Sequence, residues 1–247
     1  MCPRLYSDLS WIWPYLSPPE NYAEEAEVYF GRFRRLGVPD GGTLLHLGSG
    51  GGSLDSHLKA NYRIIGIDLS PAMIEIARQV NPEVEYVQGD MRTARLGQEF
   101  DAVLLHDAAA YMTSLDDLKR CHETAAAHLV SGGALLTPPE ELRSRFKQNR
   151  VHHRTIEKDG VSVTTVEVTH DPDPSDSTFE LTFVYLIRRG GSLEIETDTH
   201  VLGVFELEDI LDAIRSSGFE SVAAESVPLS TLPSDWPWVV VTALRAS

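Results

Sequence analysis

The stretch Leu44–Asp68, LLHLGSGGGSLDSHLKANYRIIGID, decides the fold expected for this chain. It reads as a strand, a turn with four glycines, a short helix and a second strand that ends at an acid. Such a unit holds a nucleoside at the carboxyl ends of parallel strands. Glycine allows positive φ and close approach of the backbone to a ligand. Asp68 is placed to accept two hydrogen bonds from a ribose diol, so we favour a nucleoside site over an ordinary glycine turn.

The spacing of the glycines narrows the kind of nucleoside. A dinucleotide fingerprint, G-x-G-x-x-G, that started at Gly48 would need a glycine where Ser53 stands. No Gly-Lys-Ser/Thr follows the turn, which excludes a P-loop. The pattern present is G-x-G-x-G, at Gly48, Gly50 and Gly52. A ligand with a ribose but no phosphate fits this pattern best.

Composition and charge exclude several classes of partner. The chain has 247 residues and a formal net charge of −16, which disfavours binding to nucleic acid or to an anionic membrane. Its longest apolar runs have the length of strands, so we expect no membrane span. Two cysteines, Cys2 and Cys121, form neither a disulfide framework nor a zinc motif. We therefore expect a cytoplasmic protein.

Further acids and a histidine follow the next strands. Ser70 and Pro71 are the expected start of a helix, which leads to a third strand over 84–88. Asp90 follows that strand, 22 residues after Asp68, so both acids are expected to point into one cleft. A fourth strand over 100–105 ends at His106.

The rest of the chain changes its pattern twice. A helix capped by Ser114 is expected to run to Gly132-Gly133, before a fifth strand over 134–137. Residues 150–200 then read as two β-hairpins, at Asp159-Gly160 and at Gly190-Gly191. A helix over 206–217 and strands over 219–227 and 238–244 close the chain.

Five segments, in order and spacing, resemble class I S-adenosylmethionine-dependent methyltransferases: LLHLGSGGGSL, IIGIDLSPAMIEIAR, VQGDMRTARL, FDAVLLHDAAAYM and LVSGGALL. The resemblance implies an α/β fold with a Rossmann-like seven-stranded sheet, mostly parallel with its last strand antiparallel. An antiparallel sheet is inserted after the fifth strand. We expect a lid arm and helix over 1–40, a cofactor-binding core over 41–149 and 201–247, and a substrate or oligomerisation subdomain over 150–200.

The same resemblance implies S-adenosyl-L-methionine as cofactor, with S-adenosyl-L-homocysteine as product. The residues that match the family's cofactor-binding positions are Tyr22, Gly48, Ser49, Gly50, Asp68, Leu69, Met73, Asp90, Met91 and His106. Within this set Asp90 is expected to meet the adenine amino group. Leu69 and Met73 are expected to border the ring.

The layout is similar to that of N,N-dimethyltransferases that act on nucleotide-linked amino sugars. Those enzymes have a comparable inserted sheet and a T-H-x-x-x-x-F segment, which matches Thr199–Phe205 here. Two positions depart from the pattern. Pro18, Pro19 and Glu20 replace the usual basic residue of the lid, and His46 replaces an acid in the first strand.

The expected reaction is an in-line displacement on a sulfonium, which mainly requires alignment and exclusion of water. No metal is needed, and no cluster has the spacing of metal ligands. If the acceptor is an amine, a proton must leave it, and a histidine of near-neutral pKa suits that task. His106 is the first candidate and His200 the second, with Tyr6 and Asp107 positioning a small-molecule acceptor.

Other functions remain open at this stage. The same scaffold serves polyamine synthases and NAD-dependent oxidoreductases, and a non-catalytic binder could retain the cofactor pocket. His46 gives the binder weight, whereas retention of Asp68 and Asp90 counts against it. Methylation of nucleic acid is disfavoured by the charge and by the absence of an Asn/Asp-Pro-Pro-aromatic motif after the fourth strand. A homodimer is expected only by analogy with the family.

Overall fold

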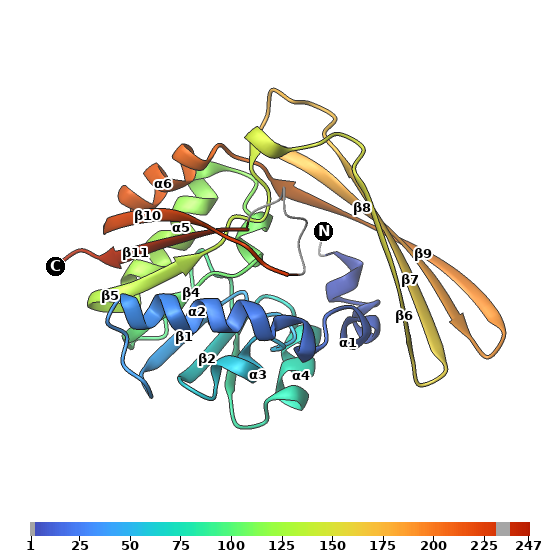
Figure 1. Cartoon of the computed structure of the whole chain (residues 1–247), viewed down its shortest axis with the longest axis horizontal. Coiled ribbons are helices and arrows are strands. Elements are labelled where there is room, and N and C mark those ends of the chain that lie inside the picture. The colour runs from blue at the N-terminus through green and yellow to red at the C-terminus, as the bar shows by residue number, and fades with distance from the viewer. Residues whose placement is uncertain (1–2, 231–237) are drawn as a thin grey trace.

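The computed structural model describes residues 3–230 and 238–247, so Cys2 lies outside the described residues. Two β-sheets organise it, one flanked by helices and one projecting from it (Figure 1). The larger sheet has the order β10-β11-β5-β4-β1-β2-β3. Its strands are β1 (Thr43–Leu47), β2 (Arg63–Asp68), β3 (Glu85–Gln88), β4 (Phe100–Leu104), β5 (Leu129–Thr137), β10 (Phe219–Val227) and β11 (Trp238–Arg245).

The pairing of these strands confirms the predicted topology. β1 runs parallel to both β2 and β4, and β4 runs parallel to β5. β11 is antiparallel to both of its neighbours, β10 and β5. The carboxyl ends of β1, β2, β3 and β4 therefore meet at one edge, where parallel α/β sheets bind their ligands.

Helices cover both faces of this sheet because its strands are apolar on both sides. Leu44 packs with α2, α3 and α4, whereas its neighbour Leu45 packs with α5 and α6 on the opposite face. The α-helices are α1 (Trp13–Leu16), α2 (Ala23–Arg35), α3 (Asp55–Leu58), α4 (Pro71–Val80), α5 (Leu115–Ala127) and α6 (Leu207–Arg215). The 3₁₀ turns are η1 (Arg4–Tyr6), η2 (Ser10–Ile12), η3 (Pro19–Tyr22), η4 (Ala108–Tyr111) and η5 (Arg143–Arg145).

The expected starts of two helices are confirmed by their caps. Ser70 Oγ accepts a hydrogen bond from the Met73 amide at 3.1 Å, and Pro71 is the first residue of α4. Ser114 Oγ accepts from the Asp117 amide at 3.1 Å at the start of α5. Each cap satisfies an amide that the first helical turn leaves free.

The end of α5 was predicted wrongly. The helix stops at Ala127, and β5 begins at Leu129 rather than at Ala134. Leu129 is fully buried and pairs with Phe100, which draws the chain into the sheet before the glycines. Gly132, with φ of +75°, then lies in an irregular part of β5 instead of ending a helix.

The second sheet is a four-stranded antiparallel meander of β6 (Val151–Lys158), β7 (Val161–His170), β8 (Thr178–Arg189) and β9 (Ser192–Gly203). It confirms the predicted inserted sheet. The N-terminal segment lies between this sheet and the helix-covered sheet (Figure 1). Its apolar side chains pack on one face of the meander, in a cluster that joins Leu5, Ile12 and Leu16 to Phe183 and Tyr185. Among the described residues, no helix is long and apolar enough to cross a bilayer.

Candidate active site

A cavity of about 550 Å³ lies at the carboxyl ends of β1, β2 and β4. Its floor is formed by the turns that follow these strands. The N-terminal segment contributes Tyr6, Trp13 and Tyr22 to its wall. The meander contributes four further lining side chains, which are Leu181, Phe183, His200 and Leu202. One cavity therefore joins the nucleoside site expected from the sequence to a region bordered by the inserted sheet.

The glycine turn after β1 passes close to two neighbouring segments. Gly48 has φ of +75°, and a Cβ built on it would lie 2.1 Å from the Cβ of Ala108. A Cβ on Gly51 would lie 2.3 Å from the indole nitrogen of Trp13. Residues with side chains cannot occupy these positions without displacing the turn or the segments against it.

Asp68 is held in place by backbone amides at the end of β2. Its Oδ2 accepts a hydrogen bond from the Gly50 amide at 2.8 Å, and its Oδ1 accepts one from the Ser70 amide at 2.8 Å. Each carboxylate oxygen keeps a further lone pair, and the side chain lines the cavity. Partial burial raises the pKa of Asp68 above its ordinary value, and the two amide bonds act in the opposite direction. The geometry suits a bidentate acceptor for a ribose diol.

The two residues expected beside the adenine differ in exposure. Leu69 is 63% exposed and Met73 is buried, yet both line the cavity, as do Gly89 and Met91 after β3. An apolar side chain left open at a cavity is suited to cover one face of a ring. Met73, by contrast, also belongs to the buried side of α4.

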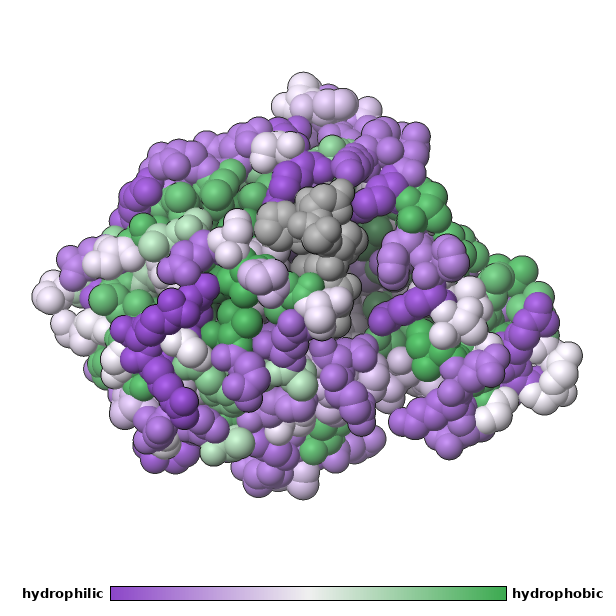
Figure 2. Space-filling model, in the orientation of Figure 1, coloured by the Kyte–Doolittle hydropathy of each residue, from purple (hydrophilic) through white to green (hydrophobic). Residues whose placement is uncertain are grey.

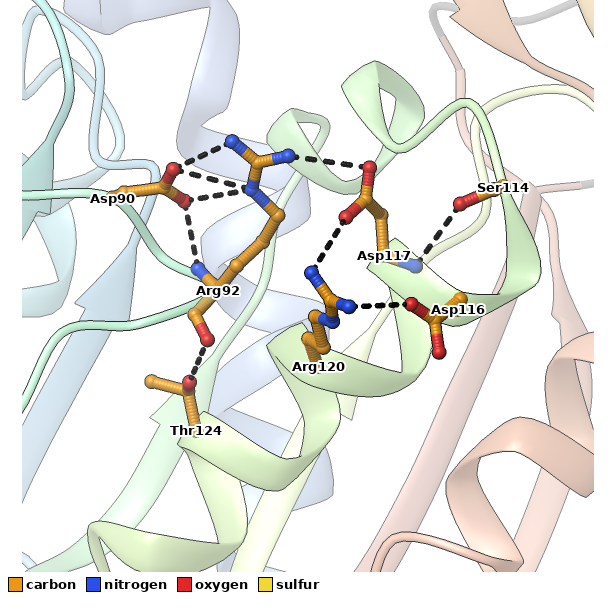
Figure 3. Close-up of polar contacts among 7 residues, drawn as sticks. All are labelled: Asp90, Arg92, Ser114, Asp116, Asp117, Arg120 and Thr124. Atoms are coloured by element: carbon orange, nitrogen blue, oxygen red, sulfur yellow. Dashed lines mark hydrogen bonds and ion pairs between the residues drawn. The ribbon is translucent and has the colours of Figure 1, made fainter.

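Asp90 is engaged by a neighbour that the sequence analysis did not weigh. Arg92 donates to its carboxylate from the backbone amide at 2.9 Å and from the guanidinium at distances down to 2.6 Å (Figure 3). The same guanidinium reaches Asp117 at 3.2 Å, and Thr124 donates to the Arg92 carbonyl at 2.8 Å. The Arg92 fork lowers the pKa of Asp90. An adenine amino group would therefore have to share this carboxylate with Arg92.

A second arginine, Arg120 on α5, extends this network of ion pairs. Arg120 contacts Asp116 at 2.9 Å and Asp117 at 3.9 Å, as Figure 3 shows. Asp116 and Asp117 stand in the first turn of α5, where the helix dipole favours negative charge. The network thus fixes the turn after β3 to α5 and places Met91, between Asp90 and Arg92, at the cavity wall.

His46, the departure in the first strand, forms a buried pair. Its Nδ1 lies 2.7 Å from Oδ1 of the fully buried Asp55, whose other oxygen accepts from the Tyr86 hydroxyl at 3.0 Å. The other imidazole nitrogen, Nε2, is buried without a hydrogen-bond partner among the described residues, and His46 lines the cavity. Ser49 also lines the cavity, and within the same part of the chain its buried Oγ has no partner either. Unsatisfied buried polar atoms are costly, so these two atoms fit a polar ligand such as the amino-acid part of S-adenosylmethionine.

The N-terminal segment is hydrogen-bonded to the cofactor side of the cavity. Ser53 donates to the Ser17 carbonyl at 2.5 Å, and Ser70 donates to the Tyr6 carbonyl at 2.6 Å. The Tyr22 hydroxyl contacts the Ser17 hydroxyl. These bonds attach the segment that carries Tyr6 and Tyr22 to the wall of the cavity.

His106 lies where the sequence placed it, at the end of β4, but it is not a histidine of near-neutral pKa. Its Nδ1 is 2.6 Å from the Tyr29 hydroxyl, and its Nε2 is 3.0 Å from Asp107 and 3.4 Å from Glu25. Burial lowers its pKa, but the surrounding carboxylates outweigh burial and raise the pKa to about 9. His106 is therefore an imidazolium at neutral pH, which removes the reason for choosing it as a base.

Three carboxylates, those of Glu25, Asp107 and Glu140, act on the charge of His106. Asp107 and Glu140 line the cavity, and Asp107 has φ of +39°, a conformation that costs energy in a residue with a side chain. Burial raises the pKa of Glu140 to about 8 and that of Glu25 to about 7. The His106 charge overcomes the effect of burial on Asp107 and holds its pKa below the ordinary value. Asp107 therefore carries the negative charge that a cationic amine would meet, whereas Glu140 is largely protonated at neutral pH.

His200 also lines the cavity, from β9. Its Nδ1 is 2.7 Å from the Tyr111 hydroxyl, and that hydroxyl is 2.7 Å from the hydroxyl of Tyr6. Its Nε2 is 2.9 Å from Asp198 Oδ2. Burial lowers the pKa of His200, although Asp198 opposes the shift. The structure therefore brings Tyr6 and His200 together through Tyr111.

Several lining or supporting residues were missed by the sequence analysis: Trp13, Glu25, Asp55, Arg92, Glu140 and Asp198. Only Arg92 carried a local signal, as a cation two residues after a candidate acid. Glu140 follows two prolines after β5, in a segment with no motif that points to the site. In the described part of the chain no three or more His, Cys, Asp or Glu side chains are grouped so as to hold a metal ion.

Comparison with known proteins agrees with this geometry. Residues 44–133 match the model of a methyltransferase domain family. The dTDP-4-amino-2,3,4,6-tetradeoxy-D-glucose N,N-dimethyltransferase of Saccharopolyspora spinosa is 29% identical over 213 residues, which cover 83% of this chain and 80% of that protein. Two solved structures are similar over nearly the whole chain.

The first is a S-adenosylmethionine-bound amino pentose methyltransferase from Micromonospora echinaspora, with a TM-score of 0.79 and 25% identity over 91% of this chain and 92% of that one. The second, DesVI of Streptomyces venezuelae, has a TM-score of 0.84 over 98% of both chains, and at 22% identity it supports the fold alone. The chain thus carries a methyltransferase domain over residues 44–133 and is a S-adenosylmethionine-dependent methyltransferase, similar in sequence and fold to nucleotide-amino-sugar N,N-dimethyltransferases.

Proposed function

We propose that this enzyme methylates the amine nitrogen of an amino sugar or a closely similar small molecule. The observation that carries the proposal is the division of one cavity into two parts of different chemistry. One part presents Asp68 and the glycine turn, which suit a nucleoside. The other presents Asp107, which is ionised and suits an ammonium group, together with Glu140, which is largely protonated at neutral pH. The amino-sugar substrate of the Saccharopolyspora relative supports the same reading.

The residues proposed to hold the cofactor are those that surround the first part of the cavity. Asp68 would take the ribose hydroxyls, Leu69 and Met91 would border the adenine, and His46 Nε2 would meet the amino-acid part. S-adenosylmethionine, when bound, supplies a methyl group already activated by its sulfonium. The protein therefore needs to align the acceptor nitrogen with that methyl and to exclude water.

The acceptor side must attract a cation and then release a proton from it. Asp107 is kept ionised by the His106 imidazolium, so it can pair with an ammonium in the cavity. His106 is proposed to position Asp107 and Tyr29 rather than to accept the proton. The Tyr6 hydroxyl can orient the amine, and His200 is the remaining candidate base.

A methyl-transfer assay tests this function. The purified protein is given S-adenosylmethionine and a panel of dTDP-linked and free amino sugars, and product mass and S-adenosylhomocysteine are measured. The matched control is the sugar with a hydroxyl in place of the amine. We expect methylation of an amino sugar and none of its hydroxyl analogue. Equal turnover of both, or none of any amine, would contradict the proposal.

We further propose that two copies associate through the outer face of the meander. Hydrophobic side chains reach the surface over this sheet (Figure 2), with Ile195 61% exposed, Val151 59% and Val201 49%. Light scattering is expected to show a dimer for the wild type and a monomer for Ile195→Glu. A wild-type monomer would contradict the association.

We also propose that the enzyme works in the cytoplasm. The buried free Cys121 suits a reducing compartment. Fractionation of the native host checks the compartment.

A further inference from the structure

We infer that four side chains form a proton relay from the acceptor into the protein interior: Tyr6, Tyr111, His200 and Asp198. The inference rests on the proposed N-methylation and adds a path for the proton that this reaction releases. It assigns Asp198 as a positioning residue, since this side chain lies behind His200 and acts through it. Tyr6 is the member that would touch the acceptor.

The four side chains come from three separate elements that the fold brings together. Tyr6 ends η1, Tyr111 ends η4, and His200 and Asp198 stand two residues apart on β9, on the same face of the strand. The successive distances between their polar atoms are 2.7, 2.7 and 2.9 Å. Each is a hydrogen-bonding distance, so the line is continuous from the cavity to the buried carboxylate.

The direction of the hydrogen bonds follows from counting donors and acceptors. Asp198 accepts from the Leu5 amide at 2.8 Å, and as a carboxylate it also accepts the proton on His200 Nε2. A neutral imidazole then has a free lone pair on Nδ1, which accepts from the Tyr111 hydroxyl. Because the Tyr111 hydroxyl proton is donated to His200, the Tyr111 oxygen accepts a hydrogen bond from the Tyr6 hydroxyl.

The consequence is that the Tyr6 hydroxyl turns a lone pair, and not its proton, toward the rest of the cavity. Tyr6 lines that cavity together with Asp107, the carboxylate that suits an ammonium. An N–H of the acceptor is the donor that matches such a lone pair. Burial raises the pKa of Tyr6 far above its ordinary value, so it carries a proton in the resting enzyme.

The proton step balances without any further reactant. An ammonium N–H proton passes to Tyr6 as the Tyr6 proton passes to Tyr111 and the Tyr111 proton passes to His200 Nδ1. The nitrogen lone pair thus freed attacks the methyl carbon, and the carbon–sulfur bond breaks with its electron pair on sulfur. His200 becomes an imidazolium paired with Asp198. The proton returns to water along the same path once the product has left.

The surroundings of His200 suit a transient imidazolium. Asp198 is 2.9 Å away, and Glu167 on β7 raises the pKa of His200, whereas burial lowers it. The other groups against the ring are neutral: Tyr6, Tyr111 and Phe183, whose ring centre is 4.7 Å from that of His200. His200 is therefore neutral at rest, unlike His106, and is free to receive a proton.

Two substitutions interrupt the relay at different points. Tyr111→Phe removes the middle hydroxyl, and Asp198→Asn removes the charge behind His200 while keeping its size. The matched control is Ser175→Ala, which removes a hydroxyl that donates to Asp173 at 2.6 Å in the loop between β7 and β8. Calorimetric titration with S-adenosylmethionine and thermal unfolding show whether each variant stays folded and binds cofactor.

We expect both relay variants to lower kcat at pH 7 by about 100-fold, as for the loss of general base catalysis. We expect KM for the acceptor and Kd for the cofactor to change less than about threefold. The deficit should shrink as pH rises, because an acceptor that arrives as free amine has no proton to lose. A deficit equal at every pH, or a change in KM alone, would overturn the relay and leave a structural role.

A spectroscopic measurement tests the hydrogen-bond directions without any turnover. In ¹⁵N-histidine-labelled protein at pH 7, His200 is expected as the neutral tautomer with its proton on Nε2, and Asp198→Asn is expected to weaken that preference. An Nδ1-protonated or charged His200 in the wild type would overturn the inference. Failure of the proposed function looks different, since wild-type protein would then methylate no amine while this tautomer stayed unchanged.

Discussion

Removal of the His106 charge should change how stability depends on pH. The structure raises the pKa of this buried imidazole to about 9, from an ordinary value of 6.5. A group whose pKa is higher in the folded than in the unfolded state binds protons more tightly when folded. Its contribution is complete below pH 6.5 and is lost as pH rises to 9. The shift corresponds to about 3 kcal/mol at most.

The comparison that isolates this contribution is wild type against His106→Gln. Urea unfolding of both at pH 6 and at pH 9.5 gives the free energy of unfolding, and the difference between the proteins is followed. Glu25 and Glu140 also have raised pKa values, of about 7 and about 8, so both proteins lose stability with rising pH. The free energy of unfolding of the wild type exceeds that of His106→Gln at pH 6, and this difference should fall by about 2–3 kcal/mol between pH 6 and pH 9.5. A constant difference, or an imidazole of His106 that titrates near pH 6.5 by NMR, would refute the reasoning.

Three further substitutions test other parts of the site. Gly48→Ala should abolish cofactor binding in calorimetry, because its Cβ would meet Ala108 at 2.1 Å. His46→Ala should lower the free energy of unfolding in urea by about 3 kcal/mol, because the buried Asp55 loses the imidazole that is 2.7 Å away; a loss below 1 kcal/mol would argue against the pair. Ser114→Ala should cost about 1 kcal/mol in the same assay through loss of the α5 cap, with unchanged cofactor binding.

Local patterns were sufficient to predict most of the fold. The glycine turn, the Ser70-Pro71 helix start and the two hairpins are each decided by residues close together in sequence, and the structure has them. The end of α5 was not predictable in this way. It is set by the pairing of Leu129 with Phe100, which lies on another strand.

The same distinction between local and distant residues applies to the active site. Residues at strand ends, such as Asp68 and His106, could be placed from the order of the strands alone. What surrounds each of them could not, because the partners come from distant segments: Glu25 and Tyr29 of α2 lie beside His106. Those partners decide the pKa of His106. They turn the first candidate for a base into a cation.

Calorimetric titration with S-adenosylmethionine, for wild type and for Asp68→Ala, tests the central claim most directly. We predict saturable one-to-one binding to the wild type, weakened at least tenfold in the variant, or about 1.4 kcal/mol, through loss of the ribose contact. Circular dichroism confirms that the variant is folded. Absence of binding to the wild type, or equal affinity in both proteins, would contradict the account of this cavity as a S-adenosylmethionine site.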